Sequence, residues 1–220
     1  MNKFYRVMKG MFGWLYRRLW RVKVINREKE PLDKPFIVCA NHTSMMDGPM
    51  VLVSLKSQMR CMTKKEVFKI PLVGWFVKAM GGFPIDRKKG DIAAMRLTLD
   101  ILKGGESIAI FPQGTRCPYV HPRDTELKSG IGMFAERSGV GILPVCIKNK
   151  KGRVRFFSRN KFILGDYIPP EDLKFEGSSR ERYEKITEFA FSKVIELYDL
   201  EEAKEQAKKQ AKKDKKKKKK

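Results

Sequence analysis

Short apolar runs alternate with longer segments of helical periodicity along most of this chain. The runs predicted as strands are residues 36–40, 60–63, 82–85, 107–111, 142–147, 154–157 and 161–164. The segments predicted as helices lie between them, at residues 49–55, 68–80 with a break at Pro71, 91–103 and 127–138. Several strands are apolar at consecutive positions, as parallel strands covered on both faces require. The pattern predicts an α/β fold, a single domain with a mostly parallel sheet flanked by helices.

Residue types at the ends of two helices indicate where those helices stop and start. Residues 91–103 carry apolar side chains three or four positions apart, and Gly104 and Gly105 are expected to end that helix. A last helix is expected to begin at Ser178, because Ser178 and Glu181 have the spacing of a capping box. The last thirteen residues of the chain hold ten lysines and one aspartate, a composition that predicts a disordered tail.

The first 24 residues have a different character, with seven basic side chains, six aromatic side chains and no acidic one. On a helix, the apolar residues share one side and the basic residues lie opposite: Phe4, Met8, Met11, Phe12, Leu15 and Leu19 against Arg6, Lys9, Arg17 and Arg21. The longest uncharged stretch has seven residues, whereas roughly twenty are needed to cross a bilayer. We therefore expect an amphipathic helix that lies on an anionic membrane surface. The alternative is a helix packed on the domain with its arginines in water.

The chain of 220 residues divides into this N-terminal helix at residues 1–24, a core domain at residues 25–200, and the end of the last helix with the lysine tail at residues 201–220. Its formal net charge of +23 favours binding to a negatively charged partner, which could be nucleic acid, an anionic membrane or an acidic protein. No zinc-finger or aromatic RNA-binding pattern occurs, so no specific nucleic-acid partner is predicted. The four cysteines form no Cys-x-x-Cys pair and no metal-ligand cluster, which indicates reduced thiols and no metal site.

His42 and Asp47 are the first candidates for chemistry. Both follow the apolar run of residues 36–40, so we expect them in a loop at a strand end. Residues five apart diverge by about 140° on a helix with 3.6 residues per turn, and a loop is needed for the two side chains to meet. An imidazole oriented by a carboxylate is the arrangement of a general base. The pair alone leaves open a surface histidine and a helix-capping aspartate.

Three further blocks follow in order, Gly81-Gly82-Phe83-Pro84-Ile85-Asp86-Arg87, Phe111-Pro112-Gln113-Gly114-Thr115-Arg116 and Ile142-Leu143-Pro144-Val145. With the His42 segment they resemble the four motifs of the glycerolipid acyltransferase family, in particular the bacterial 1-acyl-sn-glycerol-3-phosphate (lysophosphatidic acid) acyltransferases. The resemblance covers about residues 20–200. One position departs from the family: Gln113 stands where glutamate is usual, which keeps the carbonyl acceptor but removes the charge.

The resemblance implies which residues hold the substrate. Arg116, Arg87 and Lys64 are the candidates for its phosphate, because a guanidinium group can bind phosphate through two parallel hydrogen bonds. Gln113, Gly114 and Thr115 are expected beside the phosphate or the glycerol. His42, Arg87 and residues 114–116 all follow predicted strands, and open parallel sheets bind ligands at the carboxyl ends of their strands.

The implied reaction needs no cofactor and no covalent intermediate, and no Gly-x-Ser-x-Gly motif occurs. His42 would take a proton from the sn-2 hydroxyl of 1-acyl-sn-glycerol 3-phosphate as that oxygen attacks an acyl thioester, either acyl-coenzyme A or acyl carrier protein, and Asp47 would hold the imidazole. Phosphatidic acid would form in phospholipid biosynthesis on the cytoplasmic face of the membrane. Two alternatives stay open: another acceptor, such as a lyso-aminolipid or glycerol 3-phosphate, and a polyanion-binding protein.

Overall fold

Seven strands form one sheet in the order β1-β7-β6-β2-β5-β3-β4 in the computed structural model, which describes residues 3–85 and 92–217. The strands are β1 (Val22–Ile25), β2 (Ile37–Ala40), β3 (Met59–Lys64), β4 (Gly82–Ile85), β5 (Ser107–Ile110), β6 (Ile142–Asn149) and β7 (Asn160–Leu164). Neighbouring strands are parallel except for β6 and β7, which run antiparallel. The predicted α/β fold with a mostly parallel sheet is confirmed.

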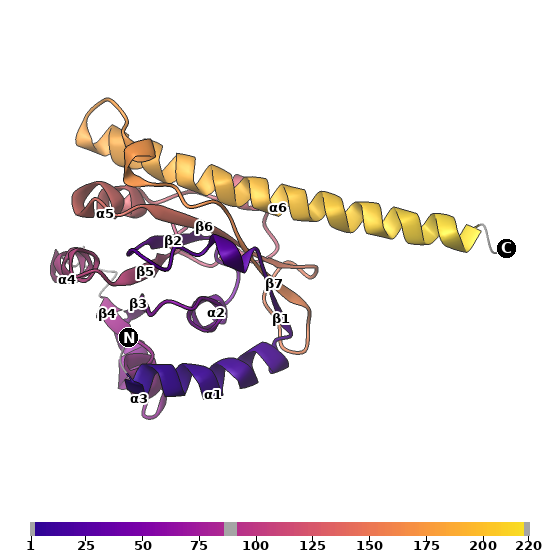
Figure 1. Cartoon of the computed structure of the whole chain (residues 1–220), viewed down its shortest axis with the longest axis horizontal. Coiled ribbons are helices and arrows are strands. Elements are labelled where there is room, and N and C mark those ends of the chain that lie inside the picture. The colour runs from indigo at the N-terminus through magenta and orange to yellow at the C-terminus, as the bar shows by residue number, and fades with distance from the viewer. Residues whose placement is uncertain (1–2, 86–91, 218–220) are drawn as a thin grey trace.

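Helices cover both faces of this sheet (Figure 1). The α-helices of the described residues are α1 (Lys3–Leu19), α2 (Asp47–Ser54), α3 (Val73–Ala79), α4 (Ile92–Lys103), α5 (Gly130–Ser138) and α6 (Ser179–Lys217). The short 3-10 helices are η1 (Arg27–Lys29), η2 (Lys65–Lys69), η3 (Pro122–Asp124) and η4 (Pro170–Leu173). In β2, Val38 and Ala40 pack on the side of α1 and α2, whereas Ile37 and Cys39 pack on the side of α4, α5 and α6. All four side chains are fully buried, which explains the uninterrupted apolar run in the sequence.

Helix α1 packs against the domain through Tyr5, Met8 and Tyr16, which are all buried. This buried side differs from the apolar side predicted from the sequence. Lys9 and Arg17, which the sequence places on the basic side of this helix, donate hydrogen bonds to carbonyl oxygens at the carboxyl end of α2 and in the turn that follows it. The last carbonyl groups of a helix lack partners within the helix and carry partial negative charge, so they attract cations.

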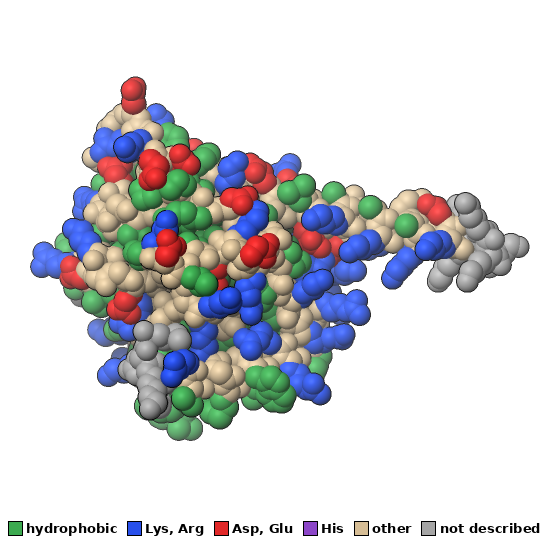
Figure 2. Space-filling model, in the orientation of Figure 1, with side chains coloured by type: hydrophobic (Ala, Val, Ile, Leu, Met, Phe, Trp, Pro, Cys, Tyr) green, Lys and Arg blue, Asp and Glu red, His purple; other side chains and the backbone are tan. Residues whose placement is uncertain are grey.

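The orientation of α1 leaves apolar side chains in contact with solvent. On α1 these are Val7, Met11, Trp14 and Leu15, each between 44% and 62% exposed. Helix α3 and the turn before it add Ile70, Leu72, Val73 and Trp75, each between 44% and 82% exposed. Phe12 of α1 and Phe76 of α3 meet edge to face with their ring centroids 4.8 Å apart, so the two helices lie side by side. We call the eight exposed residues the apolar rim, and Figure 2 shows apolar side chains along the lower edge of the molecule, where α1 and α3 lie in Figure 1.

One predicted strand is wrong and one observed strand was not predicted. Residues 154–157 form part of the loop between β6 and β7, because the buried side chain of Asn160 binds both main-chain groups of Arg155 that a strand would pair. Strand β1 lies in residues assigned above to the N-terminal helix. That helix ends at Leu19, and Arg21 takes a φ of 45°, which turns the chain into β1.

The C-terminal segment also differs from the expected disordered tail, because α6 continues to Lys217. Residues 201–217 contain no glycine or proline and consist mainly of alanine, glutamate, glutamine and lysine, which are strong helix formers. Lys161 pairs with Glu201 and Glu205, and the side chains of residues 206–215 are all exposed. The helix therefore projects beyond the sheet (Figure 1).

The two predicted helix ends are confirmed. At the end of α4, Gly105 takes a φ of 81° and the N–H of Glu106 donates to the carbonyl of Ile101. At the start of α6, the N–H of Ser178 donates to Oε2 of Glu181 at 2.7 Å, and the N–H of Glu181 donates to Oγ of Ser178 at 3.4 Å. None of the helices within residues 3–85 and 92–217 is long and apolar enough to span a membrane.

Candidate active site

The site lies at the carboxyl edge of the sheet, where β2 ends. Asn41 follows the strand and is 1% exposed. Its Nδ2 donates to the carbonyl of Ile147 at 2.9 Å, and its Oδ1 accepts from the N–H of Ile147 at 2.8 Å. These bonds satisfy a buried side chain and fix the point at which the chain leaves the strand. Sequence reasoning gave Asn41 no role, although a polar residue directly after a buried strand was a usable signal.

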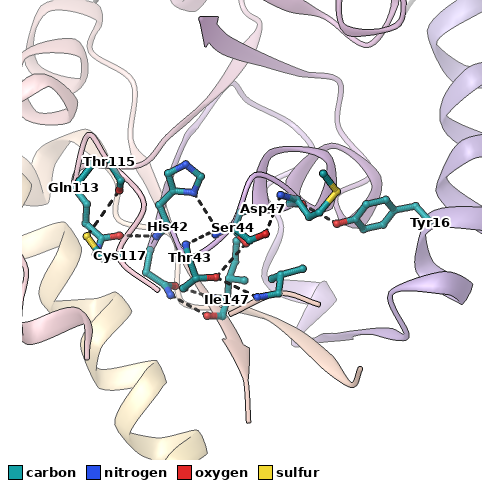
Figure 3. A network of polar contacts seen from close by, with 12 residues as sticks. Tyr16, His42, Thr43, Ser44, Asp47, Gln113, Thr115, Cys117 and Ile147 are labelled. Atoms are coloured by element: carbon teal, nitrogen blue, oxygen red, sulfur yellow. Dashed lines mark hydrogen bonds and ion pairs between the residues drawn. The ribbon is translucent and has the colours of Figure 1, made fainter. Parts of the chain in front are cut away.

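Asp47 organises the turn after Asn41 (Figure 3). Its carboxylate is completely buried, and Oδ2 accepts from the N–H groups of Thr43 at 2.5 Å and Ser44 at 2.7 Å. The same oxygen lies 2.9 Å from Nδ1 of His42. Hydrogen bonds from fixed main-chain donors to a carboxylate are strong and directional, so they set the position of the oxygen that meets the imidazole. The predicted loop between His42 and Asp47 is present.

Three further contacts hold His42. Its ring stacks on Phe111, with ring centroids 4.2 Å apart and an interplanar angle of 17°. Its carbonyl accepts from the N–H of Cys117 at 2.8 Å, and its N–H donates to Oε1 of Gln113 at 2.5 Å. When the Asp47 carboxylate accepts from Nδ1–H, the lone pair of Nε2 is available for a proton. The side chain is 16% exposed, so solvent reaches it.

Gln113 supports this arrangement from the end of β5. It is 5% exposed, and while Oε1 accepts from His42, Nε2 donates to Oγ1 of Thr125 at 2.9 Å. Thr125 in turn donates to the carbonyl of Pro122 at 2.6 Å. Both ends of the amide are therefore used inside the protein. A glutamate could still accept from His42 but could not donate to Thr125.

A pocket of about 530 Å³ opens beside the His42 turn. It is lined by residues 43–46 after β2, residues 115, 116 and 118 after β5, and residues 153–156 between β6 and β7. The structure thus brings Thr115 and Arg116 to the same pocket as the turn that holds His42 and Asp47. Gly114 precedes them with a φ of 66°, a conformation that glycine adopts without strain.

Of the two other predicted phosphate ligands, one lies away from the pocket and one lies outside the described residues, whereas two arginines that were not predicted line the pocket. Lys64 ends β3, is exposed, and does not line the pocket. Arg87 lies outside the described residues. Arg153 and Arg155 line the pocket but were not singled out in the sequence. Arg155 falls in the predicted strand at residues 154–157, and Arg153 directly precedes it.

The second histidine belongs to a different group of side chains. Nε2 of His121 lies 2.9 Å from Oδ1 of Asp199 on α6, and Glu202 is close enough to complete a possible set of three metal ligands. Both carboxylates already have cationic partners, since Arg123 pairs with Asp199 and Lys148 pairs with Glu202. The group therefore fastens the loop after β5 to α6 and is satisfied without a metal.

The four cysteines are free thiols. Burial raises the pKa of each of them, that of Cys146 to about 12. A raised pKa suppresses the thiolate, which is the nucleophilic form of cysteine. These thiols are therefore poor candidates for an attacking group.

Comparison with known proteins adds independent information. A family model described as Acyltransferase matches residues 21–148. A 1-acyl-sn-glycerol-3-phosphate acyltransferase of Bacillus subtilis (strain 168) is 30% identical over 179 residues, which are 80% of this chain and 87% of the relative. An enzyme of the same name from Streptococcus pneumoniae is 31% identical over 180 residues, which are 78% of this chain and 65% of the relative.

A solved structure is also similar. The crystal structure of the 1-acyl-sn-glycerophosphate (LPA) acyltransferase PlsC from Thermotoga maritima superposes with a TM-score of 0.61 at 26% sequence identity. The match covers 86% of this chain and 81% of the other. The family model alone spans more than half of the chain, and the paired His42 and Asp47 lie within it. This chain belongs to the acyltransferase family.

Proposed function

We propose that this chain transfers a fatty acyl group from an acyl thioester to the free sn-2 hydroxyl of 1-acyl-sn-glycerol 3-phosphate, giving phosphatidic acid in phospholipid biosynthesis. The observation that carries the proposal is the pair of His42 and Asp47, held at 2.9 Å beside a pocket lined by Arg116. The relatives from Bacillus subtilis and Streptococcus pneumoniae are named for this activity.

His42 is the proposed general base. Its Nε2 accepts the proton of the sn-2 hydroxyl while that oxygen attacks the thioester carbonyl and forms the new C–O bond. Asp47 keeps the imidazole in the required tautomer and stabilises the imidazolium. When the C–S bond breaks, the imidazolium returns the proton to the leaving thiolate, so a free thiol and phosphatidic acid are released. A base of this kind accelerates a reaction typically by about 10²- to 10⁴-fold.

Arg116 is the proposed phosphate ligand, with Thr115 and Gly114 beside the phosphate or the glycerol. Lys64 and Arg87 remain candidates that rest on the family motifs. A phosphate fixed in the pocket limits the positions that the sn-2 hydroxyl can take, and such orientation lowers the barrier. The acyl donor, acyl-coenzyme A or acyl carrier protein, is a co-substrate, and these steps use no cofactor.

The presence of Gln113 in place of the usual glutamate does not argue against 1-acyl-sn-glycerol 3-phosphate as the acceptor. Both ends of its side chain bind the protein, so the difference from the usual glutamate changes the support of the His42 loop rather than the lining of the pocket. We therefore favour a positioning role for Gln113 over contact with substrate. A lyso-aminolipid and glycerol 3-phosphate remain the alternative acceptors, and activity assays with each acceptor distinguish them from 1-acyl-sn-glycerol 3-phosphate.

We also propose that the apolar rim rests on an anionic bilayer, at its cytoplasmic face. Trp14 and Trp75 are 62% and 58% exposed, and the exposed side chains of Arg6, Arg18 and Lys78 lie on the same two helices. Exposed apolar surface with aromatic and basic side chains is typical of a helix at a membrane interface. Trp14→Glu should lower binding to phosphatidylglycerol vesicles by about tenfold or more, whereas Leu200→Glu, at a 59% exposed site on α6, should not. Equal losses would contradict the placement.

The enzymatic proposal is tested by acyl transfer to 1-acyl-sn-glycerol 3-phosphate from acyl-coenzyme A and from acyl carrier protein. His42→Ala should lower kcat by about 10²- to 10⁴-fold, and Arg116→Ala should raise KM for the acceptor. A folded protein that binds vesicles but acylates only glycerol 3-phosphate or a lyso-aminolipid would identify the other acceptor. Full activity in His42→Ala would overturn the mechanism.

A further inference from the structure

The loop between β6 and β7 is unusually basic. Residues 150–159 contain five lysines and arginines and no acidic residue. Arg153 and Arg155 are the two that line the pocket beside His42. Neither belongs to the motifs that carry the resemblance to the family.

Hydrogen bonds to other segments hold this loop at several points. Asn160 is fully buried, and its side chain binds the carbonyl groups of Trp20, Arg155 and Ser158. At the other end, the carbonyl of Gly152 accepts from the N–H of Tyr119 at 3.0 Å. These bonds tie the loop to the N-terminal segment and to the loop after β5. The main chain of the loop is therefore held in place by the rest of the fold.

Val154 fixes the direction of the two arginines. Its side chain is 4% exposed in the core, and its N–H donates to Oγ1 of Thr43, the residue after His42, at 3.3 Å. Arg153 and Arg155 stand on either side of this buried residue and both face the pocket. The guanidinium carbon of Arg153 also lies 5.6 Å from the ring centroid of Tyr119, which places it between the two loops.

Three arginines therefore converge on one pocket: Arg116 from the loop after β5, and Arg153 and Arg155 from the loop after β6. Among the residues that the structure describes, no acidic side chain lines the pocket. Within residues 3–85 and 92–217, no carboxylate forms a salt bridge with any of the three. Guanidinium groups gathered without counter-charges favour binding of an anion, and a phosphate ester with up to two negative charges matches their geometry.

We propose that Arg153 and Arg155 complete, together with Arg116, a phosphate subsite next to the catalytic histidine. The inference rests on the proposed function, because it takes the anion to be the phosphate of a substrate. Two substrates offer this chemistry, the phosphomonoester of the acceptor and the phosphates of acyl-coenzyme A. The subsite extends the phosphate ligands beyond those implied by the family motifs.

The test compares Arg153→Gln, Arg155→Gln and the double variant with Arg159→Gln. Arg159 belongs to the same loop and is exposed, but it does not line the pocket, so its variant removes the same charge elsewhere. Each pocket variant should raise KM for one phosphate-bearing substrate by about tenfold, the effect expected for a lost charge-assisted hydrogen bond. The value of kcat should change less than KM, and Arg159→Gln should leave both near the wild-type values.

The KM values for the two substrates show which of them places its phosphate in the subsite. An increase in KM for 1-acyl-sn-glycerol 3-phosphate alone assigns the subsite to the acceptor. An increase in KM for acyl-coenzyme A, absent for an acyl-N-acetylcysteamine thioester that lacks phosphate, assigns it to the donor. Unchanged KM values for both substrates, or an equal effect of Arg159→Gln, would overturn the subsite.

Direct measurements of ligand binding test the phosphate subsite independently of the proposed acyl transfer. Isothermal titration calorimetry of glycerol 3-phosphate and of coenzyme A to the full chain needs no turnover. If the wild-type protein binds either ligand and the double variant binds it about tenfold or more weakly, the subsite stands even if no lysophospholipid is acylated. If the wild-type protein is active and the double variant binds both ligands equally well, the subsite alone fails. Thermal melts of all variants show whether they are folded.

Discussion

At the scale of single residues, the negative charge of Asp47 should matter more for catalysis than the size of its side chain. The N–H groups of Thr43 and Ser44 and Nδ1 of His42 all meet one oxygen, Oδ2. In Asp47→Asn the amide oxygen could still accept from them, but the bonds would lose their charge assistance and the imidazolium would lose the negative charge that stabilises it. We expect kcat to fall by about 10²-fold or more and the free energy of unfolding to fall by about 1–3 kcal/mol. Steady-state kinetics and urea unfolding measure the two effects.

Asp166→Asn is the matched control for Asp47→Asn. Asp166 is 86% exposed and pairs with Lys29 at the surface, where an ion pair contributes little. Its substitution should leave kcat unchanged and shift the free energy of unfolding by less than about 0.5 kcal/mol. A fully active Asp47→Asn protein would show that catalysis does not need the negative charge of Asp47.

Gln113 offers a test of its positioning role. Gln113→Glu keeps an acceptor for the N–H of His42 but removes the donor to Thr125, so we expect a moderate loss of kcat with an unchanged preference among acceptors. Gln113→Leu removes both bonds and should cost about 1–3 kcal/mol of unfolding free energy by leaving the N–H of His42 without its acceptor. Activities with 1-acyl-sn-glycerol 3-phosphate and glycerol 3-phosphate measure the preference. A change of acceptor in Gln113→Glu would instead place residue 113 in contact with substrate.

The residues of the site differ in how far the sequence could predict them. The spacing of His42 and Asp47 predicted a loop at a strand end, and the structure has it. Arg155 was missed because residues 154–157 were predicted as a strand, whereas the side chain of Asn160 binds the main chain of Arg155 and holds the segment as a loop. Arg153 directly precedes that segment and carried no signal of its own. The orientation of Gln113 depends on Thr125, twelve residues further along the chain, and no local pattern predicts such a contact.

At the scale of elements, Lys9 gives the docking of α1 a pH dependence. Burial lowers the pKa of Lys9 from 10.5 to about 8 in the folded protein, against an opposing effect of Glu30. Between about pH 8 and 10.5 the unfolded chain therefore binds more protons at this residue, so the contribution of Lys9 to the free energy of unfolding rises with pH. Below pH 8 both states are protonated and the cost of burying the ammonium group is fully present.

Lys9→Met removes this contribution. Urea unfolding of both proteins from pH 7 to pH 10 should give a difference, wild type minus variant, that increases with pH above about 8. Comparing the two proteins cancels the titration of tyrosines and other groups that they share. Parallel curves over the whole interval would show that Lys9 titrates normally in the folded state.

The packing of α1 also shows what periodicity does and does not predict. The sequence indicated an amphipathic helix, and α1 is one, but the buried side is centred on Tyr5 and Tyr16 rather than on the strip with Met11 and Leu15. Periodicity identifies a helix with unlike faces. The face that meets the domain also carries Lys9 and Arg17, whose acceptors are carbonyl groups at the end of α2 and in the turn after it, and the local pattern of α1 does not reveal these partners.

At the scale of the whole molecule, the apolar rim and the basic extension of α6 lie on different sides of the sheet. The rim belongs to α1 and α3, whereas α6 packs on the opposite face and projects from it (Figures 1 and 2). Residues 208–220 hold ten lysines and one aspartate, so they contribute +9 of the net charge of +23. The lysines of the described part of this extension are thus separate from the surface proposed to meet lipid.

Removing residues 208–220 should therefore separate polyanion binding from catalysis. The exposed side chains of residues 206–215 make no tertiary packing contact, so the melting temperature should change by less than about 2 °C. Acyl transfer in detergent should persist, because His42 and the pocket lie at the carboxyl edge of the sheet. Binding to DNA should weaken strongly and its salt dependence should become shallower, since fewer counterions are released on binding. If truncation abolished acyl transfer in detergent while the fold was retained, the helix would take part in catalysis, and the two functions would not be separable.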